Sequence, residues 1–321
     1  MKIKILIIAI SFFIINVSLT SGAFIKQSKI SNENSSVEVL SGGDRVVTRR
    51  ALIIGVDNYV YSDKDAIELK NSLSSKGWDE SNINILINEE ANKDNILSAL
   101  DLLAEQEDSD DIVIFYFSGH GDEACIYSYD DRAINIIDLD TKFDNFESKK
   151  VILIFDCCFS GSMPNEDSDT QTNLIIKNLK INNKSSLEKN DYDSYGGLAQ
   201  LGRIILTACN STEYSYADSL LENGIFSYFL IDGFNGLNNS DLNKDGWISI
   251  KEAFRYAKPR TISYIEQYDL KQHPQMYNGC FRDIKITKIN EKSSFERVKL
   301  PNLLITFLRM HFKLIDNLVW A

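Results

Sequence analysis

Two short segments carry the residues that could do chemistry, and each follows a run of apolar residues. His120 lies in Ser-Gly-His-Gly after residues 111–117, and Cys157 and Cys158 lie in Asp-Cys-Cys-Phe-Ser-Gly after residues 151–155. A cysteine thiolate is a nucleophile, and a nearby imidazole can hold the thiolate and later protonate a departing amine. The two segments together indicate thiol-based acyl transfer. The alternative interpretation is a pair of small core cysteines at the end of a strand.

The elements that must position these groups are buried strands. Runs rich in Val and Ile predict strands at residues 51–56, 83–87, 112–117, 151–155, 203–208 and 284–289. Helical patterns at residues 66–75 and 92–106 lie between the first three strands. Strands alternating with helices predict an α/β fold with a mostly parallel sheet and helices on both faces. Reactive groups collect beyond the carboxyl ends of such strands, so the imidazole and a thiol are expected at one sheet edge.

The spacing of these motifs resembles the caspase-like cysteine peptidases. Ser-Gly-His-Gly is followed by Asp-x-Cys-x-Ser-Gly, with 38 residues from His120 to Cys158. Among these peptidases, the motifs are most similar to those of metacaspases and their prokaryotic relatives. Aligned on this motif, the nucleophile is Cys158 rather than Cys157. Alternation along a strand agrees, because only one of two successive side chains can face His120. Phe159 is a departure, since metacaspases usually have His there.

The resemblance implies a caspase-like three-layer sandwich built on a six-stranded, mostly parallel sheet. We expect this peptidase domain at residues 46–290. It would comprise a large half at 46–163, an exposed mobile loop at 164–197 and a small half at 198–290. The loop is where the two halves meet in the family and where many members are cut, although an uncut loop is an equal alternative here.

The same resemblance implies the roles of the site residues. Cys158 attacks the peptide carbonyl, His120 protonates the leaving amine, and the backbone N–H groups of Gly121 and Cys158 stabilise the oxyanion. Asp65, Ser118 and Asp156 match positions that bind substrate.

Two carboxylates in a partly desolvated pocket favour a cationic P1 side chain, Arg or Lys. Capping of the helix at 66–75 is the structural alternative for Asp65. A legumain-like peptidase specific for Asn or Asp is a further alternative. Residues 57–65 contain neither Arg nor His, which argues against it.

A second motif predicts calcium binding. Residues 241–252, Asp-Leu-Asn-Lys-Asp-Gly-Trp-Ile-Ser-Ile-Lys-Glu, fill every position of an EF-hand-like loop. The predicted ligands, at loop positions 1, 3, 5, 7, 9 and 12, are Asp241, Asn243, Asp245, Trp247 through its carbonyl, Ser249 and Glu252. Helices expected at 224–236 and 251–265 flank the loop. No second EF-hand is evident in the sequence. The calcium ion at this single loop could therefore either stabilise the fold or act as a switch that activates the protein.

The ends of the chain and its charge restrict where it works and what it binds. Residues 1–23 form a signal peptide, with Lys2 and Lys4 before an apolar run, followed by a flexible linker or pro-segment at 24–45. A secreted protein is therefore expected, with an uncleaved anchor as the alternative. Removing residues 1–23 deletes two lysines and no acid, so the net charge falls from −12 to −14, which excludes nucleic acid as a partner.

The C-terminal extension and the cysteine count complete the sequence picture. Residues 291–321 contain apolar positions at helical spacing, and they predict a helix docked on the domain or, alternatively, one lying at a membrane surface. Five cysteines, an odd number, leave at least one thiol free. The sequence thus predicts a secreted, Ca²⁺-binding cysteine endopeptidase that cleaves proteins or peptides after Arg or Lys. The alternative from another class is a catalytically silent module that binds peptides or partners under calcium control.

Overall fold

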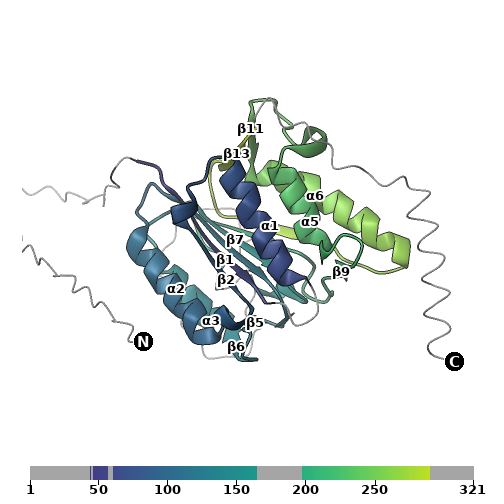
Figure 1. Ribbon diagram of the computed structural model, residues 1–321, viewed down its shortest axis with the longest axis horizontal. Helices are drawn as coiled ribbons and strands as arrows, with labels where there is room; N and C mark the ends of the chain where they lie inside the picture. The colour runs from purple at the N-terminus through teal and green to yellow at the C-terminus, as the bar shows by residue number, and fades with distance from the viewer. Residues whose placement is uncertain (1–43, 45, 57–60, 165–196, 290–321) are drawn as a thin grey trace, which may run out of the picture. The chain divides into compact units, whose positions relative to one another are not determined.

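A six-stranded β-sheet forms the centre of the domain (Figure 1). The computed structural model describes residues 44, 46–56, 61–164 and 197–289. The strands lie in the order β2 (Ile83–Ile87), β1 (Arg49–Gly55), β3 (Ile112–Ser118), β7 (Val151–Asp156), β8 (Arg203–Thr207) and β12 (Gln275–Asn278). β12 is antiparallel to β8, and all other neighbouring strands are parallel. The predicted α/β class with a mostly parallel sheet is confirmed.

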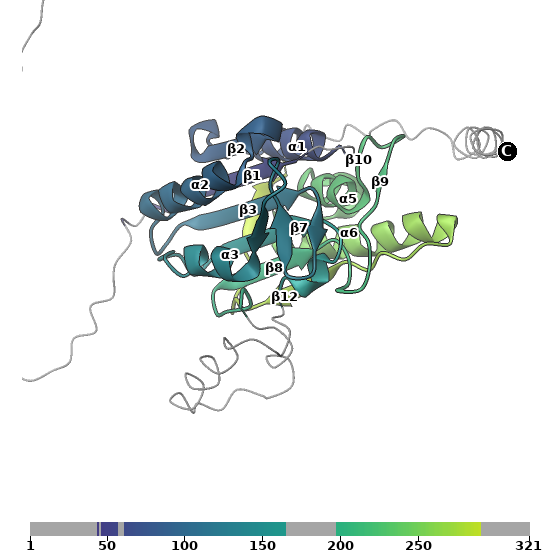
Figure 2. The same ribbon diagram turned by 90° about the horizontal axis from the view of Figure 1, so that it is seen from below.

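Helices cover both faces of this sheet (Figures 1 and 2). One face carries α1 (Ser62–Ser75), α5 (Ile225–Phe234) and α6 (Ile250–Ile265), and the other carries α2 (Lys93–Gln106) and α3 (Ile136–Phe143). Successive strand side chains alternate between the two faces. Ile114 of β3 therefore joins the cluster that contains Leu69 of α1, whereas Phe115 joins the one that contains Leu100 of α2.

The two central strands that lead to the predicted site are buried along their whole length. Every residue of β3 and β7 is shielded from solvent. The ring of Phe115 lies 5.8 Å from that of Phe155 and 5.3 Å from that of Phe143 in α3. Each such apolar side chain contributes about 1.5–3 kcal/mol on burial, so the ends of β3 and β7 are held by a well-packed core.

The last predicted strand, at residues 284–289, is not part of the six-stranded sheet. Residues 284–289 were expected to complete the sheet, but β13 (Lys285–Lys288) instead pairs antiparallel with β11 (Trp247–Ser249). The sixth strand of the sheet is β12. Ile286 of β13 is buried in the cluster that contains the residues of α1, α5 and α6, and the indole N–H of Trp78 donates to the Ile286 carbonyl at 2.9 Å. An apolar pattern indicates burial but does not select the partner strand.

Two further small sheets lie beside the carboxyl ends of the central strands. β4 (Gly121–Asp122), β5 (Cys125–Tyr127) and β6 (Ala133–Asn135) form a three-stranded sheet directly after β3. β9 (Ala217–Asp218) and β10 (Asn223–Gly224) form a hairpin that leads into α5.

Several predictions fall on parts of the chain outside the described residues. These are the signal peptide at 1–23, the linker at 24–45 apart from residue 44, the loop at 164–197 apart from its two end residues, and the extension at 291–321. The predicted boundaries of these parts stay predictions. Within the described ranges, no helix has both the length and the apolar character needed to cross a bilayer.

Candidate active site

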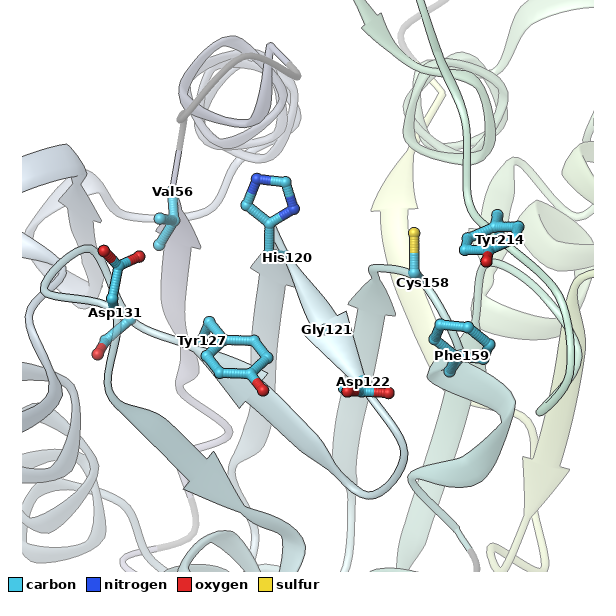
Figure 3. Close-up of a pocket in the computed structure, with 10 residues that line it drawn as sticks. Val56, His120, Gly121, Asp122, Tyr127, Asp131, Cys158, Phe159 and Tyr214 are labelled. Atoms are coloured by element: carbon cyan, nitrogen blue, oxygen red, sulfur yellow. The ribbon is translucent and has the colours of Figure 1, made fainter.

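Parallel pairing of β3 with β7 brings the two reactive segments to the same level. Ser118, the last residue of β3, lies opposite Asp156, the last residue of β7, and the N–H of Gly119 donates to the Asp156 carbonyl at 3.2 Å. The chain leaves both strands at one edge of the sheet, so His120 and Cys158 line the same pocket, which has a volume of about 410 Å³. Figure 3 shows both side chains projecting to the same side, beyond the ends of the strands.

The turn after β7 exposes one cysteine and buries the other. Cys157 is 1% exposed and packs in the core, whereas Cys158 is half-buried and faces the pocket. Phe159 follows with φ 55°, a left-handed conformation that is unusual for an aromatic residue, and its N–H donates to the Glu213 carbonyl at 2.9 Å. This strained turn directs the Cys158 side chain away from the core and toward the pocket.

The pocket needs glycine at position 121. A Cβ on Gly121 would lie 2.6 Å from the Cys157 sulfur and 3.0 Å from the Cys158 carbonyl oxygen. The backbone of the His120 segment therefore packs directly against the nucleophile turn. The remaining walls come from Val56, Asp122, Tyr127, Ser128, Asp131, Phe159 and Tyr214.

The Cys158 thiol is held in its protonated form. Burial raises its pKa above the ordinary value and outweighs an opposing contribution from the Ser215 backbone. The sulfur also donates to the Ser215 carbonyl at 3.7 Å, a contact that favours the thiol form. A thiol in this state requires a base before it can attack a carbonyl. The imidazole of His120, which is exposed and lines the same pocket, is available for that role.

The two predicted carboxylates lie together beside the nucleophile, but they are buried. Asp65 is 0% exposed and Asp156 is 5% exposed, and neither lines the pocket. Burial raises the pKa of Asp65 well above its ordinary range, and the charge of Asp156 raises it further. Burial also raises the pKa of Asp156.

Both carboxylates are held by hydrogen bonds from several elements. Asp65 accepts from the Ser118 hydroxyl at 2.8 Å, from the Asn223 amide at 2.9 Å and from the Gly224 N–H at 3.1 Å. Helix α1 begins at Ser62 and its cap is Tyr61, so the alternative that Asp65 caps this helix is wrong. The side chain of Asp65 turns away from its own helix terminus.

Asp156 is connected to the nucleophile through one residue. Its Oδ1 accepts from the Ser215 hydroxyl at 2.5 Å, while the Ser215 carbonyl accepts from the Cys158 thiol. Its Oδ2 accepts from the N–H and the hydroxyl of Ser227, at 3.0 and 2.6 Å. Ser215, Asn223 and Ser227 were not predicted from the sequence, since single serine and asparagine residues outside any motif carry no signal of a shared site.

The predicted calcium loop has the turns that its sequence requires. Gly246 has φ 79° and Lys244 has φ 60°. Backbone N–H groups of the loop donate to the side chains of Asp241, Asn243 and Asp245 at 2.8–3.2 Å, so these oxygens point into the loop. An oxygen-rich set of this kind fits Ca²⁺.

The last predicted calcium ligand is buried at the start of α6. Glu252 is 4% exposed and accepts from the N–H groups of Leu242, Asn243 and Ser249 at 2.9–3.2 Å. Burial opposes ionisation of Glu252, but these hydrogen bonds outweigh it, and the pKa of its carboxyl is lowered. The side chain is therefore ionised and oriented toward the loop.

β13 occupies the position next to the loop where a second hand would pair. Trp247 and Ser249, at loop positions 7 and 9, pair with Lys288 and Lys285 of β13, and Lys285 also binds the Asp245 carboxylate at 2.8 Å. The flanking helices are α5, which ends at Phe234, and α6. The expected helix at 224–236 is thus slightly shorter at both ends.

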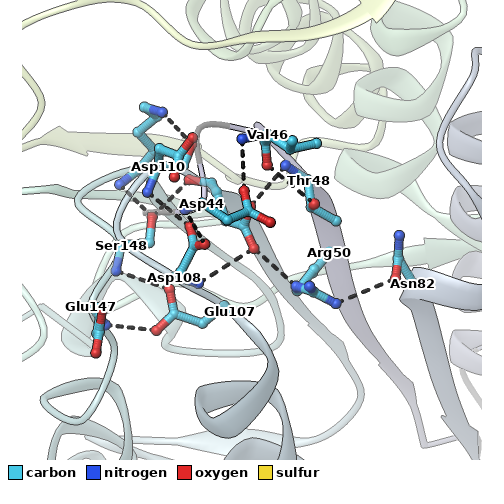
Figure 4. Close-up of polar contacts among 12 residues, drawn as sticks. Asp44, Val46, Thr48, Arg50, Asn82, Glu107, Asp108, Asp110, Glu147 and Ser148 are labelled. Carbon is cyan, nitrogen blue, oxygen red and sulfur yellow. Dashed lines mark hydrogen bonds and ion pairs between the residues drawn. The ribbon is translucent and has the colours of Figure 1, made fainter. Parts of the chain in front are cut away.

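A separate acidic cluster lies at the opposite edge of the sheet (Figure 4). Oxygen atoms of Asp44, Asp108 and Asp110 lie within 4.8 Å of one another, and the N–H of Asp44 donates to Asp108 at 3.1 Å. Nearby, Arg50 and Asp111 form an ion pair of 2.9 Å. Because this cluster is at the amino ends of β1 and β3, it has no part in the pocket of His120 and Cys158.

Comparison with known families agrees with the fold. The family model described as Caspase domain, from the peptidase C14 group, matches residues 48–284. This range is more than half of the 321 residues, and the chain belongs to this family of caspase-like cysteine peptidases. The resemblance seen in the motifs is confirmed at this level.

The structural search gives a weaker similarity. The crystal structure of protein GSU0716 from Geobacter sulfurreducens aligns over 76% of this chain and 100% of its own, with 16% identity and a TM-score of 0.48. No curated protein sequence matches the chain.

We predict that alkylation of Cys158 by iodoacetamide accelerates with pH and is still rising at pH 9, because burial raises the thiol pKa and only the thiolate reacts. Tandem mass spectrometry of tryptic peptides gives the rate at each cysteine, with fragment ions separating Cys157 from Cys158, which share one peptide. Cys280 is a matched internal reference, since burial raises the pKa of its half-buried thiol to about 11 and it should react more slowly. A Cys158 rate that is already maximal at pH 6 would contradict this account of the resting thiol.

Proposed function

We propose that the protein is a cysteine endopeptidase that hydrolyses peptide bonds with Cys158 as nucleophile and His120 as acid–base partner. The observation that carries the proposal is the shared pocket at the ends of β3 and β7, which is lined by both a half-buried thiol and an exposed imidazole. Membership of the caspase family supports the same chemistry, because a peptidase domain implies protein or peptide substrates.

The reaction proceeds through an acyl-enzyme. His120 takes the proton of the Cys158 thiol, and the thiolate forms a C–S bond to the scissile carbonyl carbon. The C–N bond then breaks, and His120 returns the proton to the leaving amine. Water, deprotonated by the same imidazole, attacks the thioester, releases the new carboxylic acid and regenerates the thiol.

The oxyanion formed on attack requires preorganised donors. The N–H groups of Gly121 and Cys158 are proposed for this role, and the close packing of Gly121 on the nucleophile turn supports it. One such donor typically contributes about 10²–10³ in rate.

A basic P1 residue is proposed because the pocket adjoins two carboxylates. Asp65 and Asp156 have no cationic side chain paired with them among the ion pairs of the described residues. Ser118 completes the group by its bond to Asp65. Since the carboxylates are covered by hairpin β9–β10, a P1 side chain reaches them only when this hairpin moves aside.

Calcium at residues 241–252 is proposed as a clip within the small half. The donors would be Asp241, Asn243, Asp245, the Trp247 carbonyl, Ser249 and Glu252, and the ion would supply positive charge that neutralises the acidic loop. The loop joins α5 to α6 and pairs with β13. Export from the cell is proposed from the signal peptide predicted at residues 1–23.

The dyad is tested by two neighbouring variants. Cys158→Ala is expected to reduce kcat to background, because no other thiol lines the pocket, whereas Cys157→Ala should retain most of the activity. Cleavage of fluorogenic peptides with Arg, Lys, Asn or Asp at P1 is the measurement. The reverse result for the two cysteines would mean that the nucleophile is misassigned. No cleavage of any peptide by the wild type would favour the silent binding module.

The charge of the P1 site is tested by Asp156→Asn, which keeps the size of the side chain. We expect kcat/KM for Arg and Lys peptides to fall about a hundredfold, because one desolvated charge pair is lost. In the wild type, this activity should decline as pH falls through a range above the ordinary carboxyl pKa, since both carboxyl pKa values are raised and protonation removes the attraction. Unchanged kinetics in the variant would exclude Asp156 from P1 recognition.

Calcium binding is tested by Glu252→Gln, which removes one charge from the loop. Titration calorimetry with CaCl₂ should show a loss of affinity of about tenfold or more, because the carboxylate at position 12 is a principal ligand. Trp247 lies within the loop, so its fluorescence gives an independent readout. Lys251→Gln is the matched control, since it also changes one charge at a neighbouring residue. Equal calcium affinities in the wild type, Glu252→Gln and Lys251→Gln would show that residues 241–252 do not bind calcium.

A further inference from the structure

A closed group of hydrogen-bond acceptors lies between α1, β7 and hairpin β9–β10. It contains the carboxylates of Asp65 and Asp156 and the amide oxygen of Asn223, a residue that is 0% exposed. Gly224 packs between the two carboxylates, since a Cβ there would lie 2.6 Å from Asp156 Oδ2 and 3.0 Å from Asp65 Oδ2. The hairpin therefore forms one wall of this acceptor group.

The Asn223 side chain has a partner at one end and none at the other. Its Nδ2 donates to Asp65 Oδ1 at 2.9 Å, which fixes the orientation of the amide. Its Oδ1 is buried and accepts no hydrogen bond from the residues that the structure describes. Buried polar atoms are nearly always paired in native proteins, so an unpaired acceptor beside two carboxylates indicates a donor that arrives with a ligand.

The neighbouring acceptors are largely occupied by protein donors. Ser118 and Gly224 bind Asp65, and Ser215 and Ser227 bind Asp156. A cation that binds here is attracted by the negative charge of the carboxylates, but few of the oxygen lone pairs are free to accept its hydrogen bonds. The two lone pairs of the Asn223 amide oxygen are among the free ones.

We infer that Asn223 is a specificity-determining residue whose amide oxygen accepts a hydrogen bond from the guanidinium of a P1 arginine. This inference rests on the proposed peptidase function and deepens it. The acceptors come from three separate elements, α1, β7 and β10, and thus from three directions. A guanidinium carries N–H donors along the edges of a planar fork, whereas the lysine ammonium is a compact point charge. The arrangement therefore favours Arg over Lys at P1.

Hairpin β9–β10 must move for the side chain to enter. Outside the acceptor group, the hairpin is held by an exposed ion pair between Glu222 and Lys64 of α1 and by a hydrogen bond from the Tyr268 hydroxyl to Asp218 at 3.2 Å. An exposed ion pair contributes about 0–1 kcal/mol and a single hydrogen bond about 0.5–1.5 kcal/mol, so these contacts oppose the movement only weakly. Entry of the P1 side chain exchanges the closed contacts of Asn223 for a bond to the substrate.

The test uses the full chain and three fluorogenic peptides that differ only at P1: arginine, lysine and citrulline, the neutral isostere of arginine. We expect the wild type to cleave the arginine peptide at least about tenfold better than the lysine peptide and to cleave the citrulline peptide poorly. Asn223→Leu, of similar volume, should lower kcat/KM for arginine by about tenfold and reduce the ratio of arginine to lysine cleavage.

The matched control is Asn235→Leu. Asn235 caps α5 at its other end and accepts from the Ser72 hydroxyl at 2.9 Å, outside the acceptor group, so both peptides should be affected equally. Should Asn223→Leu not fold, Asn223→Ala is measured instead, with thermal melting as the criterion of folding.

Two results would overturn the inference while leaving the peptidase assignment intact. One is wild-type protein that cleaves lysine as well as arginine peptides, and the other is an arginine-to-lysine ratio that Asn223→Leu or Asn223→Ala leaves unchanged. Wild-type protein that cleaves none of the three peptides, nor the Asn and Asp peptides, would instead overturn the proposed function on which the inference rests.

Discussion

The in-register parallel pairing of β3 with β7 is the constraint on which the site depends. Ser118 lies opposite Asp156, and the two strands are buried on both faces, so neither can shift without breaking the core. A shift of one residue would also turn every side chain to the other face of the sheet. The tight segments that follow the strands then bring His120 and Cys158 to one pocket, and the close contact of Gly121 with Cys157 sets their spacing.

A second layer of interactions connects the buried carboxylate of Asp156 to the Cys158 thiol. Ser215 binds Asp156 through its hydroxyl and Cys158 through its carbonyl, and Gln272 donates to the Ser215 hydroxyl at 3.1 Å. These contacts lie on segments that are far apart in the sequence. The buried carboxylates cost stability in their charged form, because burial raises their pKa values.

The sequence predicted the central sheet well, because buried Val and Ile runs are local patterns that identify strands. The spacing of acidic residues around Gly246 is also a local pattern, and it indicates calcium binding, which stays a prediction. The edge strand was predicted wrongly at 284–289, since burial of Ile286 against helices gives the same pattern as burial in a sheet. The contact of Asn223 with Asp65 could not be predicted, because the two residues are 158 positions apart and meet only through hairpin β9–β10.

The most direct test of the central claim is labelling with a peptidyl-arginine acyloxymethyl ketone, followed by intact mass and tryptic mapping. The account predicts one adduct per chain, located on Cys158, and labelling at neutral pH that is slower by about 10²-fold or more in His120→Ala, since the imidazole must generate the thiolate. An adduct on Cys157, or labelling of Cys158 at an unchanged rate without the imidazole, would contradict it.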